Sequence, residues 1–233
     1  MHFRDRPSPN FDQRTAGSAI DMLILHYTGM KSAAEALDRM CDPAVKVSAH
    51  YTIDEDGTVW RLVDESARAW HAGLSSWRGR SDINAASIGI EFVNPGHEFG
   101  YRPFPEPQMA AFEELARAIL ARHPIPARHV LGHSDVAPLR KQDPGELFDW
   151  PRLAQAGIGL WPDFGKTTDE PASIAALQAA LQRIGYACPV SGELDDETRA
   201  VITAFQRHYR PRCCDGDADA ETRQRIALLA REI

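Results

Sequence analysis

The sequence predicts an α/β domain, in which helices flank a central mixed β-sheet, followed by a small domain of three helices. Short apolar runs alternate with helical patterns over residues 10–165, as in a sheet with interspersed helices. Residues 159–172 lose this periodicity and are richer in Pro, Gly and Asp, which is typical of a linker. Beyond the linker, one motif occurs twice, and an apolar helical pattern follows each copy.

A strand and a hairpin are predicted in the first quarter of the chain. Residues 1–19 are polar and interrupted by Pro and Gly, which predicts an arm on the surface. The apolar run at 22–25 stops shortly before Gly29, and this pattern indicates a buried strand. Residues 47–63 hold two β-rich segments on either side of Asp56-Gly57, a pair that hairpin turns favour.

Two helices and two further strands complete the predicted sheet domain. Ser32 and Glu35 have the spacing of a capping box, so a helix is expected over residues 32–40. The same periodicity rules predict a strand over 87–93, a helix over 107–122 and a short strand over 128–132, which an irregular loop follows.

The C-terminal residues 173–231 contain an internal repeat. The pattern Gly-x-x-Asp-x-Glu-Thr-Arg begins at Gly192 and again at Gly216. Its aspartates, Asp195 and Asp219, are predicted N-caps because apolar residues at helical spacing follow each of them. With a third helix predicted over 173–184, the region is a three-helix unit near the lower size limit for independent folding.

Composition and charge exclude several classes of protein. The chain has 233 residues, of which 43% are hydrophobic and 25% charged, as in ordinary globular proteins. Its net charge of −7 gives no basic surplus for nucleic acid. No apolar stretch has the length of a membrane span. The N-terminus does not resemble a secretory signal, and no CxxC pair occurs. We therefore expect free thiols and a cytoplasmic location, with the periplasm as the alternative.

Polar residues at the ends of predicted strands are the candidates for chemistry. His26 and His133 close two predicted strands, Glu91 lies inside the strand predicted over 87–93, and Lys141 and Asp143 are in the loop that follows His133. Such positions present reactive groups in rigid scaffolds. Two imidazoles and a carboxylate can hold zinc with a fourth position left for water. A nearby carboxylate could then accept the proton of that water, and a cation could stabilise an oxyanion.

From the residues alone, other interpretations stay open. A histidine after a strand is more often a hydrogen-bonded structural residue than a metal ligand. His50 and His71 compete as ligands on composition alone. Glu91 could be half of a buried ion pair, and Lys141 could be a solvated cation. Aromatic residues are core residues by default. Spacing therefore does not decide between a catalytic site and a set of structural residues.

A family resemblance covers most of the chain. Four segments, in order over about residues 18–165, are LHYTGM, VSAHYTIDEDGTVWRLV, AWHAGLSSWRGRSDINAASIGIEFVNPG and GHSDVAPLRKQDPGELFDW. They resemble the type 2 family of N-acetylmuramoyl-L-alanine amidases, which includes AmpD-like and AmiD-like branches and is related to the peptidoglycan recognition proteins. The segment LAQAGIGLWPD is more similar to the AmiD-like branch. LQAALQRIGY, GELDDETRAVITAFQ and DGDADAETR resemble the type 1 peptidoglycan-binding domain.

The resemblance implies domains and residue roles. It implies a zinc amidase domain over 1–165, a linker over 166–172 and a peptidoglycan-binding-like helical domain over 173–233. By position in the family motifs, His26, His133 and Asp143 would bind Zn²⁺. Glu91 would position or deprotonate the attacking water, and Lys141 would stabilise the oxyanion. Suggested substrate contacts are Tyr51, Trp70, His71, Arg80, Asn84 and Arg140, and His50 becomes structural.

The resemblance also implies a reaction. We expect hydrolysis of the amide that joins N-acetylmuramic acid, including its 1,6-anhydro form, to L-alanine of the stem peptide, in peptidoglycan recycling or turnover. The partner is then a muropeptide or a peptidoglycan fragment. The alternatives are a recognition module that binds muropeptides without cleaving them, an exported amidase acting on intact peptidoglycan, and a zinc peptidase that cleaves within the stem peptide.

Overall fold

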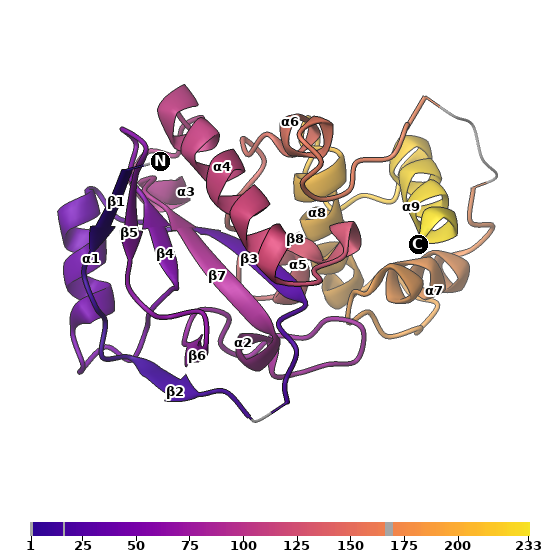
Figure 1. The fold of residues 1–233 in the computed structure, drawn as a ribbon. Coiled ribbons are helices and arrows are strands. Elements are labelled where there is room, and N and C mark those ends of the chain that lie inside the picture. Colours follow the sequence, from indigo (N-terminus) through magenta and orange to yellow (C-terminus); the bar gives the residue numbers. More distant parts are fainter. Residues whose placement is uncertain (1, 16, 166–169) are drawn as a thin grey trace.

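Six strands form one mixed sheet in the order β1, β5, β4, β7, β3, β8 (Figure 1). The structure is a computed structural model that describes residues 2–15, 17–165 and 170–233. The strands are β1 His2–Asp5, β3 Met22–Tyr27, β4 Tyr51–Ile53, β5 Thr58–Arg61, β7 Ser87–Phe92 and β8 Val130–Gly132. β3 runs parallel to β7 and β8, whereas β5 runs antiparallel to β4. The predicted mixed sheet, with its hairpin, is confirmed.

The N-terminal residues do more than form a surface arm. β1 pairs parallel with β5 at the edge of the sheet, although all four of its residues are exposed. β2, Phe11–Gln13, pairs antiparallel with β6, Ala67–Ala69. In the stretch of chain between β1 and β2, the buried side-chain amide of Asn10 donates to the carbonyls of Met40 and Val47. Backbone pairing and side-chain hydrogen bonds hold this segment, so the sequence carries no apolar signal for it.

The two predicted helices of this domain are present. α1, Ala33–Cys41, has Ser32 as its N-cap, and the Ser32 hydroxyl accepts from the Glu35 amide at 3.2 Å. α4, Glu106–Arg122, crosses one face of the sheet (Figure 1). The sequence analysis missed the short helices α2 Ile83–Ala86, α3 Gly96–Phe99, η1 Ala127–His129, α5 His133–Val136 and α6 Trp150–Gln155. Most of these have one turn, which is too short to show a helical period.

Alternation along β3 assigns its side chains to two cores. Leu23 and Leu25 pack in the cluster that includes the apolar residues of α4. Met22 and Ile24 point to the opposite face and pack in a second cluster. Because successive side chains of a strand point to opposite faces, His26 emerges on the same face as Met22 and Ile24. That face carries the candidate site described below.

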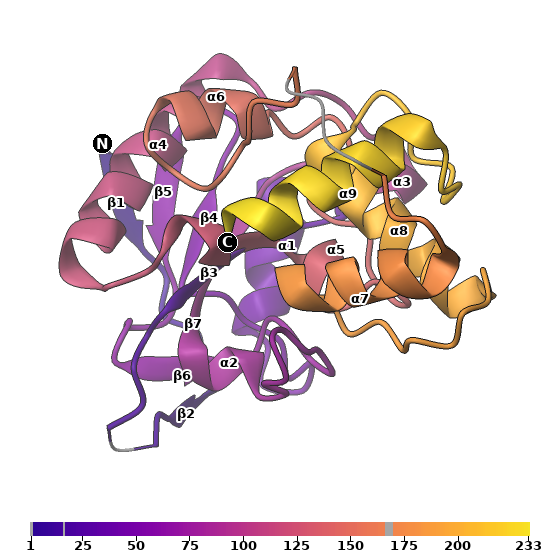
Figure 2. The same cartoon turned by 90° about the vertical axis from the view of Figure 1, so that its right-hand side faces the viewer.

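Three C-terminal helices pack against this second face. They are α7 Ile174–Ile184, α8 Asp196–Tyr209 and α9 Ala220–Glu232 (Figure 2). Asp195 and Asp219 accept from the amides three residues onward, as predicted for N-caps. Part of the predicted linker, residues 166–169, lies outside the described residues. Within the described ranges, no helix is both long and apolar enough to cross a bilayer.

Candidate active site

Three of the predicted residues meet where β3 and β8 end. His26 belongs to β3, His133 is the first residue of α5 directly after β8, and Asp143 lies in the following loop. The two Nδ1 atoms are 2.9 Å apart, and each is 3.0 Å from Oδ2 of Asp143. All three residues are at least 94% buried. Parallel pairing of β3 with β8 brings the two histidines together across 107 residues of sequence.

Hydrogen bonds behind the two histidines determine their tautomers. Nε2 of His133 lies 3.0 Å from the carbonyl of Ala72, which can only accept, so Nε2 carries the proton. On the other side, the Ser87 hydroxyl donates to the carbonyl of Ile83 at 2.7 Å and therefore accepts from Nε2 of His71 at 3.1 Å. Nδ1 of His71 then accepts from Nε2 of His26 at 3.1 Å. Both ligand-side Nδ1 atoms consequently present lone pairs.

This arrangement fits a divalent metal ion. Two imidazole lone pairs and a carboxylate oxygen converge with no proton between them, and they repel one another unless a cation lies there. His26, His133 and Asp143 form the group whose ligand atoms could hold a metal. Burial, helped by His133, lowers the pKa of His26 to about 4. Burial alone would raise the pKa of Asp143, but the two histidines hold it below its usual range. Both groups are thus in their metal-binding forms.

Glu91 and Lys141 border the same cavity. Glu91 pairs with His26 in the register of β7 and β3, so both side chains emerge on one face. Its Oε2 is covered and has no hydrogen-bond partner in the described part of the chain. Burial and the neighbouring Asp143 raise the pKa of Glu91 well above its usual value, and Lys141 opposes this shift. The cavity has a volume of about 360 Å³, and Lys141 contributes a cation to its wall.

Comparison with known proteins assigns the chain to a family. A family model described as N-acetylmuramoyl-L-alanine amidase matches residues 16–146, and one described as putative peptidoglycan binding domain matches residues 170–226. The N-acetylmuramoyl-L-alanine amidase AmiD of Escherichia coli is 40% identical over 224 residues, which cover 87% of this chain and 79% of AmiD. The chain belongs to the N-acetylmuramoyl-L-alanine amidase family.

Solved structures agree with this assignment. The amidase matches E. coli AmiD in complex with the substrate anhydro-N-acetylmuramic acid-L-Ala-D-γ-Glu-L-Lys at a TM-score of 0.82 and 37% identity, over 94% of this chain and 93% of that one. It also matches AmpDh3 of Pseudomonas aeruginosa in complex with anhydromuramic pentapeptide, at a TM-score of 0.82 and 33% identity, over 97% and 98% of the chains. The structural similarity therefore covers both the sheet domain and the three C-terminal helices of the amidase.

Three of the suggested substrate contacts lie at or behind the site. Arg140 lines the cavity and donates to the carbonyls of Ala72 and Leu74. His71 also borders the cavity, but it is 94% buried and its two nitrogens are used by His26 and Ser87. The side chain of Asn84 accepts from the amides of His71 and Ala72 at 3.1 and 2.8 Å. His71 and Asn84 thus support the candidate ligands from behind.

Trp70 and Arg80 are not brought to this cavity. The indole of Trp70 donates to Asp12 in β2 at 2.8 Å. Arg80 forms a bidentate ion pair with Asp21, which directly precedes β3. Because Met22 begins β3 and His26 lies near its end, Arg80 sits at the opposite end of that strand from the site. Both side chains hold the amidase scaffold together in the structure.

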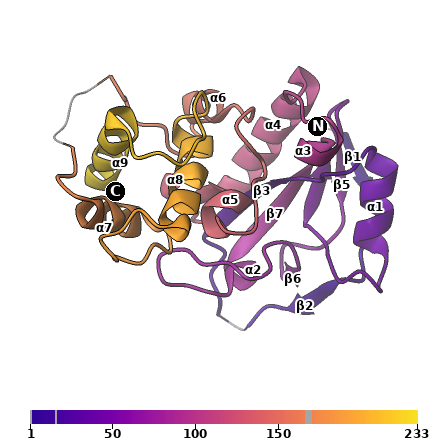
Figure 3. The same cartoon turned by 180° about the vertical axis from the view of Figure 1, so that it is seen from behind.

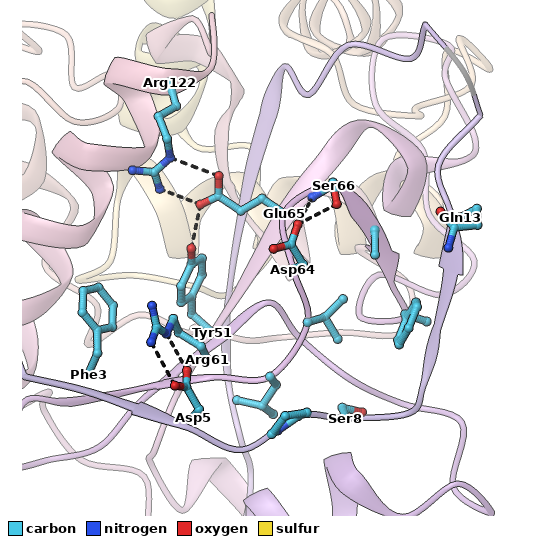
Figure 4. A pocket seen from close by; sticks show the side chains of 15 residues that line it. Phe3, Asp5, Ser8, Gln13, Tyr51, Arg61, Asp64, Glu65, Ser66 and Arg122 are labelled. Carbon is cyan, nitrogen blue, oxygen red and sulfur yellow. Dashed lines mark hydrogen bonds and ion pairs between the residues drawn. The ribbon is translucent and has the colours of Figure 1, made fainter.

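Tyr51 points to the other face of the sheet. It pairs with Ile90, the residue before Glu91, and packs in the α4 cluster. Its hydroxyl donates to the carboxylate of Glu65 at 2.7 Å, and Arg122 binds the same carboxylate (Figure 4). Burial alone would raise the pKa of Glu65, but these bonds and one from His123 lower it to about 2. Tyr51, Glu65 and Arg122 line a second cavity, which has a volume of about 840 Å³.

The sequence analysis missed two groups that support the site. Arg14, in the N-terminal segment, donates to the carbonyls of Glu65, Asn84, Ala85 and Ser87, and burial lowers its pKa to about 10. Ser87 ends the hydrogen-bond chain behind His26. Neither has a local sequence signal. His50, the competing ligand, accepts from the Gly89 amide through Nδ1 and bonds the Ala67 carbonyl through Nε2, so it is structural.

Proposed function

We propose that this protein is a zinc-dependent hydrolase that cleaves the amide between N-acetylmuramic acid, including its 1,6-anhydro form, and L-alanine of the stem peptide. The observation that carries the proposal is the convergence of three lone pairs, on His26, His133 and Asp143, in a member of an amidase family. The substrates named for the solved AmiD and AmpDh3 complexes support the choice of substrate.

The donor set matches catalytic zinc. Two histidines and one aspartate leave a fourth position open, as catalytic zinc sites do. When bound, the zinc ion would polarise the scissile carbonyl and lower the pKa of a bound water to about 7. His71 and the Ala72 carbonyl would hold the two imidazoles in the required orientation. These are contributions of the protein that exist before any substrate binds.

Glu91 is suited to move protons in this reaction. Glu91 lines the candidate cavity, its Oε2 has no hydrogen-bond partner among the described residues, and burial raises its pKa well above the usual value, which strengthens it as a proton acceptor. In the proposed mechanism, Glu91 accepts a proton from the attacking water. It then delivers that proton to the amide nitrogen of L-alanine as the carbon–nitrogen bond breaks. One carboxylate therefore serves as the base and afterwards as the acid.

Lys141 and the groove beside it complete the proposal. Lys141 would place its ammonium by the carbonyl oxygen on which negative charge develops. It also lines an adjoining cavity of about 720 Å³, whose charged residues are the cations Lys31, Arg39 and Lys141 and the carboxylates Glu35 and Glu98. A stem peptide carries free carboxylates, so we assign its path to this cavity, in which the cations outnumber the carboxylates. The sugar would then lie on the other side of the scissile amide.

The cellular location is a further part of the proposal. None of the four cysteines forms a disulfide, which is typical of proteins in reducing compartments. We propose that the protein acts in the cytoplasm on muropeptides during recycling. Fractionation of cells that express the native gene is the test. Recovery of most of the protein in the periplasmic fraction would instead favour an exported amidase that acts on intact peptidoglycan.

Mass spectrometry of products tests the reaction itself. The purified protein is incubated with anhydro-muramyl tetrapeptide, with and without a zinc chelator, beside a Glu91→Gln variant of nearly the same shape. We expect chelator-sensitive release of free tetrapeptide and anhydro-muramyl sugar, and at least a ~100-fold loss of rate in the variant. Products that keep L-alanine on the sugar would indicate a peptidase. Binding without cleavage of this or the intact muramyl substrate would indicate a recognition module.

A further inference from the structure

The face of the sheet that carries the candidate metal site shares one hydrophobic core with the C-terminal module, residues 173–233. Met22, Ile24 and Val136 of the sheet domain pack in the same cluster as Leu181 and Phe205 of the module. Leu160, Trp161 and Phe164, from the segment before the module, also pack against this cluster. Figure 3 shows α8 beside α5, and the two helices are in contact. The module is thus packed directly on the element that carries His133.

The fit at this contact is close and specific. A Cβ added to Gly185, where α7 ends, would lie 2.5 Å from the ring of Trp77, which is 98% buried. Only glycine permits such an approach. Arg78, next to Trp77, donates through its backbone amide to the Gly185 carbonyl at 2.8 Å and through its guanidinium to the Ile184 carbonyl at 3.2 Å. A cation at a helix C-terminus is stabilising.

A buried carboxylate lies at the centre of this contact. Asp135, in α5, is fully buried and accepts three hydrogen bonds. One of these hydrogen bonds comes from the amide of Gly132, which directly precedes α5, at 2.7 Å. The module supplies the other two, from the Tyr186 hydroxyl at 2.6 Å and from Nδ1 of His208 at 2.7 Å. A buried carboxylate needs such donors, and here the sheet domain supplies only one of the three.

The turn that holds Asp135 also holds two candidate metal ligands. His133 is two residues before Asp135, and the Ser134 amide donates to the carbonyl of Asp143 at 2.9 Å. A displacement of α5 therefore moves His133 directly and Asp143 through this bond. Both donors are packed in place, because the ring of His208 stacks on Trp150 of α6 with centroids 3.7 Å apart and the ring of Tyr186 lies edge-on to Trp77 with centroids 5.0 Å apart. The module thus reaches the ligands through short, well-packed contacts.

We propose that Tyr186 and His208, acting through Asp135, are positioning residues for the metal site. The C-terminal module then has a role in the catalytic domain itself, whether or not it also binds glycan. This inference rests on the proposed function only where it concerns turnover, because the geometry of the metal site can be measured without substrate. Loss of both donors leaves a buried charge with one partner, and α5 shifts to reach water.

The test compares full-length variants by zinc affinity and by turnover of a soluble muropeptide. The variants are Tyr186→Phe, His208→Ala and both together. His208→Asn is the rescue variant, because its amide can place an N–H where Nδ1–H donates. Tyr209→Phe is the matched control, since it removes a hydroxyl from a buried tyrosine that is not among the donors to Asp135. Ile226→Val loosens the core of the module without touching Asp135.

We expect the double variant to weaken Zn²⁺ affinity, measured by chelator competition, by about 10- to 100-fold, as loss of supporting hydrogen bonds does elsewhere. Its kcat should fall while KM stays within about threefold, and His208→Asn should recover most of the loss relative to His208→Ala. Both controls should keep wild-type zinc affinity. If the double variant does not fold, each single variant keeps two of three donors and provides the comparison.

A folded double variant with wild-type zinc affinity and kcat would overturn the inference. So would a loss in Ile226→Val as large as in the double variant, because general loosening of the module would then explain the effect. Failure of the wild-type protein to cleave any muropeptide would refute the proposed function instead. The zinc affinities of the variants would still decide whether Tyr186 and His208 position the site.

Discussion

Replacing His71 with leucine separates two roles for this residue. As a substrate contact, suggested by the family resemblance, its loss would raise KM and leave the metal in place. The hydrogen bonds indicate another role, because Nδ1 of His71 accepts from Nε2 of His26 at 3.1 Å and its Nε2 donates to Ser87 at 3.1 Å. Leucine cannot accept a hydrogen bond, so His26 would lose the partner that orients its ring.

The size of the effect follows from burial. His26 is 99% buried, so its Nε2–H would find no water in place of His71, and an unsatisfied buried donor costs about 1–3 kcal/mol. The cost is relieved if the ring turns or changes tautomer, and both movements withdraw the Nδ1 lone pair from the metal position. We therefore expect zinc affinity to fall by about 10- to 100-fold, equivalent to about 1.4–2.8 kcal/mol.

Chelator competition measures this loss, and two further variants sharpen it. Ser87→Ala leaves the bond between His71 and His26 in place, so it should lower zinc affinity less than His71→Leu does. Gly89→Ala should resemble His71→Leu, because a Cβ on Gly89 would lie 2.4 Å from Cγ of His71 and displace the ring. If His71→Leu kept wild-type zinc affinity and changed KM alone, the orienting role would be refuted and the substrate contact supported.

Three other predictions concern stability. The pKa of Glu65 is about 2 in the folded protein, below its ordinary value near 4.5. The ionised carboxylate therefore adds at most about 3 kcal/mol to the free energy of unfolding. This contribution is complete above pH 4.5 and disappears as the pH falls towards 2. Denaturant unfolding should show Glu65→Gln less stable than the wild type at pH 7, with the two converging near pH 2. Asp195→Ala removes the N-cap of α8 and should cost about 1 kcal/mol in the same assay, whereas an unchanged midpoint would contradict the cap. Leu181→Ala empties a fully buried position in the shared core and should cost about 2–5 kcal/mol, and a smaller loss would mean that the module contributes little to that core.

Local sequence patterns predicted the elements that have a period or a cap. The strand after residue 21, the helix capped by Ser32 and the two helices capped by Asp195 and Asp219 all carry such signals. β1 carries none, because its side chains are exposed and only backbone hydrogen bonds attach it to β5. One-turn helices such as α5 are invisible for the related reason that a period needs several turns.

For the predicted site residues that lie on strands, the face was also available from the sequence, through strand alternation. In the segment His50-Tyr51-Thr52, the side chains of His50 and Thr52 share one face and Tyr51 takes the other. Since Thr52 pairs with Glu91 in the sheet, Tyr51 had to point away from the site once β4 and β7 were paired. The family motif suggests Tyr51 as a substrate contact. Alternation along β4 instead directs its side chain to the face of the sheet opposite to that of His26 and Glu91.

Residues that support the site from behind are a different case, because their partners are distant in sequence. Asp135 meets His208 across 73 residues, and His71 meets His26 across 45. The bond between Asp135 and His208 needs the C-terminal module to be packed on the sheet domain, and the bond between His71 and His26 needs the tertiary fold of the sheet domain. A motif can identify His26, His133 and Asp143 because chemistry requires those residue types. It cannot identify Tyr186 or His208, because any buried donor in reach of Asp135 would satisfy the same carboxylate. The determinants of metal affinity therefore extend into a module that the motif assigns to a different task.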